Sequence, residues 1–230
     1  FLEELVKLFS TQLEVSNVEY QKKLRKKAEF KALQSQVNPH FLYNALNTIA
    51  CICDEDSAKA SDLILTLASY YRQTLENDQY MLDLDTEISH IRTYLQIEQA
   101  RFEEKLRVNI QVEPGLACQV PSFILQPIVE NAVRYGNGAD GVRNVEIIAG
   151  RVKDERGEEQ VRIEVRGHGK GFAPGQAEAI LSGKASGSVG LKNVHERLRS
   201  TYGKRYGLVI RNLEEGAEVS FVVPYQAETA

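Results

Sequence analysis

The sequence predicts an all-helical region over about the first hundred residues, followed by a mixed α/β region. Pro39 is the only proline or glycine in that first region, so long helices can form on both sides of it. Alternating polar and apolar residues, which are typical of half-buried strands, first occur at 106–112. This change of pattern places the boundary between the two regions near Arg107.

The helical region is expected to consist of several long helices. Residues 1–36 are predicted to form one helix with a heptad-like seam, which is typical of a parallel helix pair. The basic run KKLRKK at 22–27 indicates a solvated helix face or, alternatively, a segment just inside a membrane. Asn38 as the cap and Pro39 at the first helical position predict a kink and a restart. The seam consists of Leu2, Val6, Phe9, Leu13, Ser16 and Tyr20, and later helices are expected at about 39–54, 58–76 and 86–103.

The mixed region is expected to combine strands and helices around a glycine-rich stretch that runs from Gly167 to Gly190. Apolar alternation bounded by Pro, Gly and polar turns predicts the strands. The strands are expected at 106–112, 144–152, 160–167, 207–212 and 217–224, and the helices at 121–135 and from the end of the glycine-rich stretch to about Tyr202.

Composition limits the class of protein. A net charge of −4 gives no basic excess, so nucleic acid is not an expected partner. The odd number of cysteines (Cys51, Cys53 and Cys118) favours a reducing compartment over a disulfide scaffold. We expect no signal peptide, and no apolar run in this sequence is long enough to span a bilayer. Because the chain opens on Phe1, we expect it to be a piece of a longer protein.

His40 is the first candidate for chemistry. On a helix that starts near Pro39, an apolar stripe is predicted at Leu42, Ala45, Leu46 and Ile49. His40, Asn44 and Asn47 fall on the opposite, polar side. Periodicity alone favours a surface histidine that has no catalytic role.

The surrounding residues LQSQVNPHFLYNALNTI resemble the phosphoacceptor segment of the LytS-like (autolysis-sensor) bacterial histidine kinases. The resemblance implies that His40 takes the γ-phosphoryl group of ATP, and neutral imidazole is a competent nucleophile near neutral pH. It also implies that Asn44 orients water when phosphate is removed from the partner. Many other histidine kinases carry an acid directly after the acceptor; here that position is Phe41, so the proton acceptor is not evident.

The segment PSFILQPIVENAVRY at 121–135 resembles the N-box of the GHKL ATPase fold. The resemblance implies that Asn131 coordinates Mg²⁺ through its amide oxygen, which suits an ion that keeps several waters. Arg134 falls at the position of a phosphate-contacting base, and Glu130 and Tyr135 are further implied nucleotide-site residues. Pro127 is expected to cost this helix a hydrogen bond and to bend it.

Two glycine motifs complete the implied ATP site. GSVGLKNVHERLRSTYG resembles the second glycine box, in which Gly187, Gly190 and Leu191 lie beside the phosphates. The first box reads RGHGKGF, with Gly169 and Gly171 kept. Family members carry Asp-Asn where this chain has Gly167 and His168. In the family, that aspartate recognises the amino group of adenine, and this chain lacks it. His168 is included among the implied ATP-site residues. The segment between the two boxes, FAPGQAEAILSGKASGS, is similar to the lid of this fold.

The resemblance covers the chain from about Leu33 to Pro224 and implies a helical dimerisation and phosphoacceptor region followed by a two-layer α/β sandwich of the GHKL (Bergerat) type. The implied organisation is a signalling coiled coil at 1–32, phosphotransfer helices at 33–105 and an ATP-binding domain at 106–226. The implied function is that of a two-component sensor kinase that uses ATP and Mg²⁺.

The implied partners are a second copy of the chain, a response regulator and an upstream membrane sensor domain of the same chain. The expected location is the cytoplasmic portion of a bacterial inner-membrane protein. An alternative follows from Gly167: the chain is a dimeric signalling scaffold whose nucleotide site is impaired.

Overall fold

The computed structural model describes residues 39–76, 79–184 and 189–226. The long helix predicted at 1–36, with its seam and its basic run, lies outside these residues. None of the helices in the described part of the chain combines the length and the apolar character that a membrane crossing requires.

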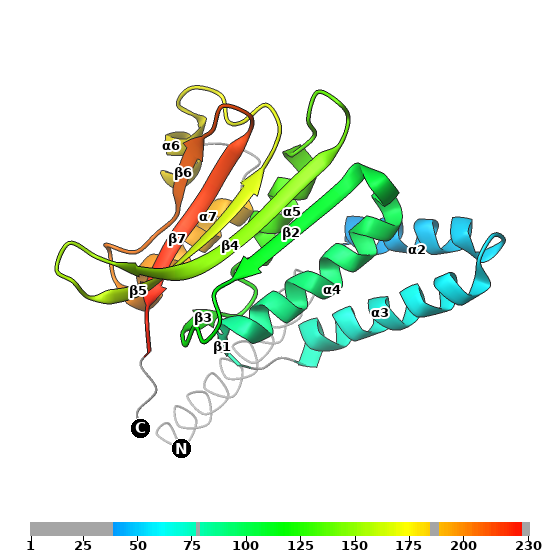
Figure 1. Ribbon diagram of the computed structural model, residues 1–230, viewed down its shortest axis with the longest axis horizontal. Helices are drawn as coiled ribbons and strands as arrows, with labels where there is room; N and C mark the ends of the chain where they lie inside the picture. The colour runs from blue at the N-terminus through cyan, green and yellow to red at the C-terminus, as the bar shows by residue number, and fades with distance from the viewer. Residues whose placement is uncertain (1–38, 77–78, 185–188, 227–230) are drawn as a thin grey trace, which may run out of the picture.

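Within the described residues, the helical region contains three helices, close to the ranges predicted at 39–54, 58–76 and 86–103. The first two form a hairpin, and the third packs against both (Figure 1). Pro39 occupies the first position of its helix, where its missing N–H costs no hydrogen bond. The helices are α2 (Pro39–Cys53), α3 (Ser57–Glu76) and α4 (Leu84–Phe102), and a 3₁₀ turn, η1 (Glu103–Lys105), follows α4.

The buried face of α2 differs from the predicted stripe, because it includes Phe41 and excludes Leu46. Phe41, Ala45 and Ile49 are buried, whereas Leu46 is 47% exposed. The prediction for Leu46 is wrong because α2 meets α3 and α4 along positions four apart, which begin at Phe41. Tyr43 and Leu46 therefore remain on the outer side of the hairpin.

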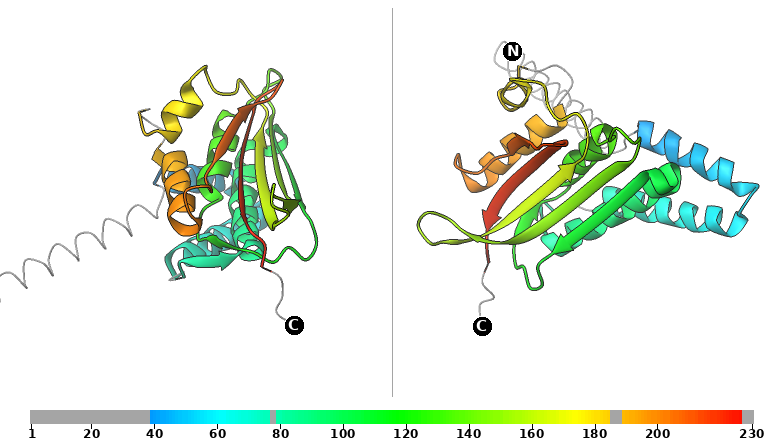
Figure 2. Two further views of the ribbon diagram at one scale, coloured as in Figure 1. Left: turned by 90° about the vertical axis from the view of Figure 1, so that its left-hand side faces the viewer. Right: turned by 45° about the horizontal axis from the view of Figure 1, so that its top comes forward.

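The second region is a five-stranded sheet with order β2-β4-β5-β7-β6, whose helices cover one face (Figure 2). β2 and β4 are parallel, and the other pairs are antiparallel. This is the predicted two-layer α/β arrangement. The strands are β2 (Leu106–Val112), β4 (Arg143–Lys153), β5 (Glu159–Gly167), β6 (Val209–Asn212) and β7 (Ala217–Pro224), and the helices are α5 (Gln126–Tyr135), α6 (Gln176–Leu181) and α7 (Val189–Tyr202).

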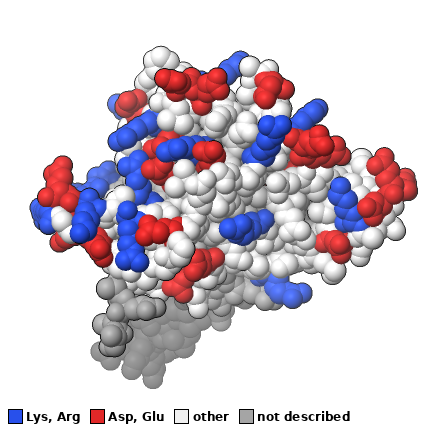
Figure 3. All heavy atoms as spheres, viewed as in Figure 1, with Lys and Arg blue, Asp and Glu red and all other residues white. Residues whose placement is uncertain are grey.

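Alternation along β5 separates the two faces of the sheet. Val161, Ile163 and Val165 are buried in one hydrophobic core with residues of the helical region. On the other face, Arg162 and Arg166 both pair with Glu218 of β7, at 3.0 and 3.2 Å. The surface view shows both signs of charge intermixed on this side of the molecule (Figure 3). The ladder of ion pairs thus covers the sheet without creating a surface of one sign.

Three expectations need correction. The helix predicted from Pro121 begins at Gln126, because Pro121 ends a short strand and Phe123 has a φ of 56°, which no helix accommodates. That strand, β3 (Gln119–Pro121), pairs antiparallel with β1 (Met81–Asp83), and both are too short to give an alternating pattern. Helix α6 also forms inside the glycine-rich stretch, where no helix is predicted.

A buried carboxylate joins the two regions. Glu87 of α4 accepts hydrogen bonds from the backbone N–H groups of Phe123 and Leu125, each at 2.9 Å, in the loop that leads into α5. Only 1% of Glu87 is exposed. Burial raises the pKa of its carboxyl to about 7, although the N–H groups oppose this shift. The ring of His90, one turn further along α4, stacks on Phe123 at 5.7 Å.

Glu87 is expected to make the stability of the protein depend on pH. Its pKa is higher in the folded chain (about 7) than at its ordinary value of 4.5, so the folded state binds this proton more tightly. The stabilising contribution of Glu87 to the folded state is therefore fully present below about pH 4.5 and is lost as pH rises through about 7. We expect the free energy of unfolding, measured by urea titration, to fall by about 2–3 kcal/mol from this group between pH 5 and 8.

The control for this pH effect is Glu87→Gln, which cannot titrate. His90 and His195, whose pKa values burial lowers, contribute the opposite trend in both proteins. The difference between the two proteins therefore isolates Glu87. Parallel stability curves for wild type and variant across this pH range would contradict the assignment.

Candidate functional site

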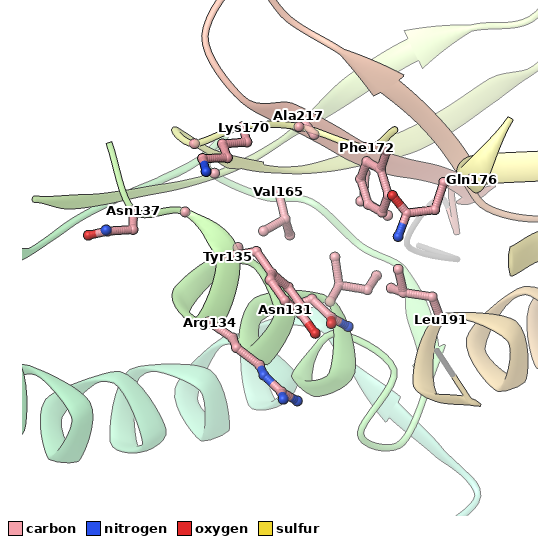
Figure 4. A pocket seen from close by; sticks show the side chains of 17 residues that line it. Asn131, Arg134, Tyr135, Asn137, Val165, Lys170, Phe172, Gln176, Leu191 and Ala217 are labelled. Carbon is pink, nitrogen blue, oxygen red and sulfur yellow. The ribbon is translucent and has the colours of Figure 1, made fainter. Parts of the chain in front are cut away.

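A cavity of about 470 Å³ lies between α5, α7 and the ends of β5 and β7. Figure 4 shows its side chains converging from these elements and from the loop after β5. Seventeen residues line it, and no carboxylate is among the described ones. They are Ile128, Asn131, Ala132, Arg134, Tyr135, Gly136, Asn137, Val165, Gly167, Gly169, Lys170, Gly171, Phe172, Gln176, Leu191, Ala217 and Val219.

Helix α5 supplies the polar side of the cavity. Pro127 lies in its first turn, where N–H groups have no acceptor within the helix, so the bend and the lost hydrogen bond expected from the sequence are not a cost here. The side-chain amide of Asn131 donates to the Pro127 carbonyl oxygen at 2.6 Å. This bond fixes the orientation of the side chain and leaves its amide oxygen as the atom for a cation or a ligand donor.

Glycines allow the loop after β5 to approach α5 closely. A Cβ atom on Gly169 would lie 2.3 Å from the Tyr135 carbonyl oxygen, which no side chain permits. Gly171 has a φ of 68°, and the backbone after it is held by Asn212, whose side chain makes two 2.8 Å hydrogen bonds to Phe172. Gly169 and Gly171 are therefore required by the shape of the backbone at this edge of the cavity.

The cavity has apolar and cationic parts. Val165, Val219 and Leu191 are buried and form apolar walls. Arg134 and Lys170 are the cations among the described lining residues, and the Arg134 guanidinium lies 5.3 Å from the Tyr135 ring centre. In Figure 4, Lys170 and Arg134 extend from opposite sides of the cavity. A ligand with a flat apolar part and several negative charges fits this distribution.

Seven of the residues predicted for the nucleotide site line the cavity. Three others do not: Glu130 accepts a hydrogen bond from Gln126, the backbone of His168 donates to Asn144, and Gly190 packs against Pro127. Gly187 lies outside the described residues. The seven are Asn131, Arg134, Tyr135, Gly167, Gly169, Gly171 and Leu191.

Sequence reasoning missed ten of the lining residues. The alternation of β5 and β7 could have indicated the inward side of Val165, Ala217 and Val219. Gln176 could not be found, because the helix that carries it was not predicted. The remaining missed residues are Ile128, Ala132, Gly136, Asn137, Lys170 and Phe172.

His40 and Asn44 lie outside this cavity, on the exposed N-terminal part of α2. The Asn44 side-chain nitrogen is 3.2 Å from His40 Nδ1 and 3.5 Å from Nε2, one helical turn away. His40 is exposed, while Phe41 beside it is buried. The start of α2 lies beside α5 in two views of the fold (Figures 1 and 2). The predicted acceptor histidine therefore faces solvent at the end of its helix that is near the cavity-lining helix.

Comparisons with known proteins relate the chain to histidine kinases. Residues 28–106 match the family described as histidine kinase. The chain is 40% identical over 96% of its length to the sensor protein LytS of Bacillus cereus, and 40% identical over 96% to the sensor histidine kinase YpdA of Escherichia coli K12. The sensor histidine kinase/phosphatase LytS of Staphylococcus aureus (strain N315) is 33% identical over 98% of the chain.

The chain spans about two-fifths of these relatives, namely 38%, 39% and 39% of their respective lengths. Among solved structures, a nucleotide-free form of the catalytic domain of the histidine kinase ThkA superposes with a TM-score of 0.50. Its sequence is 16% identical, and the match covers 63% of this chain and 94% of that one. At this identity the match establishes the fold of the second region.

The close approach at Gly169 leads to a test of the cavity edge. We expect Gly169→Ala to destabilise the protein by about 1–3 kcal/mol, because the added methyl group forces the loop away from the Tyr135 carbonyl. Gly150→Ala in β4 is the matched control, since its added carbon would meet only the flexible end of Glu113, at 3.3 Å. Urea unfolding measures both, and equal effects would contradict the proposed tight contact.

Proposed function

The chain is a homologue of the LytS-type sensor histidine kinases over nearly its whole length, and on that premise we propose that it is the kinase portion of such a protein. The proposed reaction is ATP-dependent phosphorylation of His40, followed by phosphoryl transfer to an aspartate of a response regulator. One observation carries the proposal: the exposed His40 lies on the end of α2 beside α5, and α5 lines a cavity with two cations and no described carboxylate.

ATP is proposed to place its base against the apolar walls and its phosphates toward Asn131 and the start of α7. The N-terminal N–H groups of α7, near Leu191, favour anions there. Arg134 and Lys170 supply positive charge. The amide oxygen of Asn131 is the proposed protein ligand of Mg²⁺, which when bound would neutralise charge on the phosphates.

In the proposed transfer, Nε2 of neutral His40 attacks the γ-phosphorus in line with the bond to the β-phosphate. A nitrogen–phosphorus bond forms, the bond from phosphorus to the bridging oxygen breaks, and ADP leaves. Nucleophilic Nε2 requires the ring proton on Nδ1, and this proton is released after transfer. The Asn44 amide, which lies beside both ring nitrogens, is proposed to orient water when phosphate is removed from the regulator.

The partners are proposals that follow from the same homology. A second copy of the chain suits the hairpin of α2 and α3, whose outer side exposes Tyr43, Leu46, Ile64 and Leu65. A response regulator would approach His40 from solvent. An upstream sensor domain of the same protein, embedded in the inner membrane, would control the kinase from outside the described residues, with this part of the chain in the cytoplasm.

A second candidate function is a dimeric signalling scaffold with an impaired nucleotide site. The observation that favours it is Gly167, which leaves the described cavity lining without a carboxylate to pair with an adenine amino group. The two functions differ in whether the chain binds ATP at cellular concentrations and in whether it incorporates phosphate.

Radiolabelled ATP tests the acceptor. We expect the wild-type chain to incorporate label and His40→Gln to incorporate none, because the glutamine side chain offers no nucleophilic ring nitrogen. ATP binding measured by calorimetry should be the same in both proteins, since His40 does not line the cavity. Label that persists in His40→Gln would refute the assignment of the acceptor.

Gly167→Asp tests the missing carboxylate. We expect ATP to bind about 5- to 150-fold more tightly, because the amino group gains an acceptor in a partly buried site. A Cβ at this position would lie 3.3 Å from the Ala132 Cα, so α5 must yield by a few tenths of an ångström. Gly157→Asp, which adds the same charge in the open β4–β5 turn, is the control. A variant no tighter than this control would mean that the base does not lie beside Gly167.

A further inference from the structure

Three buried aromatic rings support the helix that carries His40. The ring of Phe41 lies 5.0 Å from the ring of Tyr70 on α3 and 5.1 Å from that of Tyr94 on α4. No more than 4% of any of these three residues is exposed. Because Phe41 is the residue next to His40, the position of Tyr70 and Tyr94 sets where the start of α2 lies.

The hydroxyl group of Tyr70 also reaches α5. The side-chain amide of Gln126 donates to this hydroxyl at 2.5 Å, and the same nitrogen is 2.9 Å from a carboxylate oxygen of Glu130. Glu130 directly precedes Asn131, whose side chain lines the cavity. A short series of contacts thus connects the residue after His40 with the residue before Asn131.

The Tyr70 hydroxyl is kept neutral in this setting. Burial raises the pKa of Tyr70, and the Glu130 carboxylate raises it further. Burial likewise raises the pKa of Glu98 on α4, which Arg101 partly opposes. Tyr70 therefore acts as a hydrogen-bonding group and not as a titrating one near neutral pH. The partly buried amide of Gln126 would lose one of its two acceptors without this hydroxyl, and an unpaired N–H group in such a setting is costly.

We propose that Tyr70 is a positioning residue for phosphorylation of His40, whose hydroxyl holds α5 and its nucleotide site in register with the acceptor helix. This inference rests on the proposed kinase function and adds the residue that aligns the two reactants. Transfer requires the γ-phosphorus in line with the attacking nitrogen, and a misplacement of about 1 Å can cost about 100-fold, so a small displacement of α5 slows the chemical step. Binding of ATP itself uses other residues, since Tyr70 and Gln126 do not line the cavity.

The adjacent tyrosine provides a matched control. Tyr71 is on the same helix and its ring lies 5.2 Å from that of Tyr70. The hydroxyl of Tyr71 is buried, but it has no hydrogen-bond partner among the described residues. Tyr70→Phe and Tyr71→Phe therefore remove the same atom from neighbouring rings, and only the first removal breaks a contact with α5.

The main experiment measures autophosphorylation of the 230-residue chain with radiolabelled ATP over a range of ATP concentrations. We expect Tyr70→Phe to lower kcat about tenfold or more, with the KM for ATP and the calorimetric Kd within about twofold of wild type. Tyr71→Phe should leave kcat and KM unchanged. A merely structural role would lower the thermal stability of Tyr70→Phe without this separation of kcat from KM.

A double-mutant cycle tests whether the effect passes through Gln126. Gln126→Met keeps the length of the side chain and removes its amide. If the contact between Tyr70 and Gln126 aligns the site, the double variant should lose no more activity than the more impaired single variant. Losses that multiply would overturn the inference, as would a kcat that rises in Tyr70→Phe.

The results separate this inference from the proposed function. A wild-type chain that takes up no label at saturating ATP would overturn both. A labelled wild type with an equally active Tyr70→Phe, or a Tyr71→Phe that is equally impaired, would overturn the positioning role alone. Amide hydrogen exchange provides a readout that does not depend on activity: the backbone amides of residues 128–130 should exchange about tenfold faster in Tyr70→Phe and not in Tyr71→Phe, and unchanged exchange would contradict the contact.

Discussion

The buried carboxylate of Glu87 is the constraint on which the site depends. It accepts the backbone N–H groups of Phe123 and Leu125, and so fixes the loop from which α5 starts. Arg197 of α7 donates to the carbonyl oxygen of Ser122 in the same loop. Since α5 and α7 form two sides of the cavity, the width of the cavity is set where α4, α5 and α7 meet. A loop with a residue at positive φ needs such support, because its conformation is unfavourable alone.

The two regions consequently behave as parts of one packed unit in this structure. Buried residues of α2, α3 and α4 belong to the same hydrophobic core as those of the sheet. Polar contacts, which depend on direction, also join the two regions. The Tyr70 hydroxyl accepts a hydrogen bond from Gln126 of α5, and the Tyr80 hydroxyl lies 3.2 Å from that of Thr201 of α7. Unlike the packing of the core, such contacts can be broken one at a time, and they therefore offer points at which the helices could control the cavity.

Sequence patterns predicted most of the elements, because alternation and helical periodicity report which side of a strand or helix is buried. They failed where the burial of a residue or the start of a helix depends on residues that are distant in the sequence. Leu46 is apolar yet exposed, and the start of α5 depends on the backbone of Phe123. For the site, motif resemblance selected seven lining residues, but it also selected Glu130, which meets Gln126 instead. Lys170 and Gln176 reach the cavity only through the path of the loop after β5, and no local pattern encodes that path.

The central claim is that one imidazole on α2 receives phosphate from a nucleotide bound beside α5. Mapping of phosphopeptides from the chain after incubation with ATP and Mg²⁺ tests it most directly, under alkaline conditions that preserve a nitrogen–phosphorus bond. The account predicts an acid-labile phosphoryl group on the peptide that contains His40 and on no other. Phosphate on His90, His168 or His195, or on a hydroxyl side chain in place of His40, would contradict it.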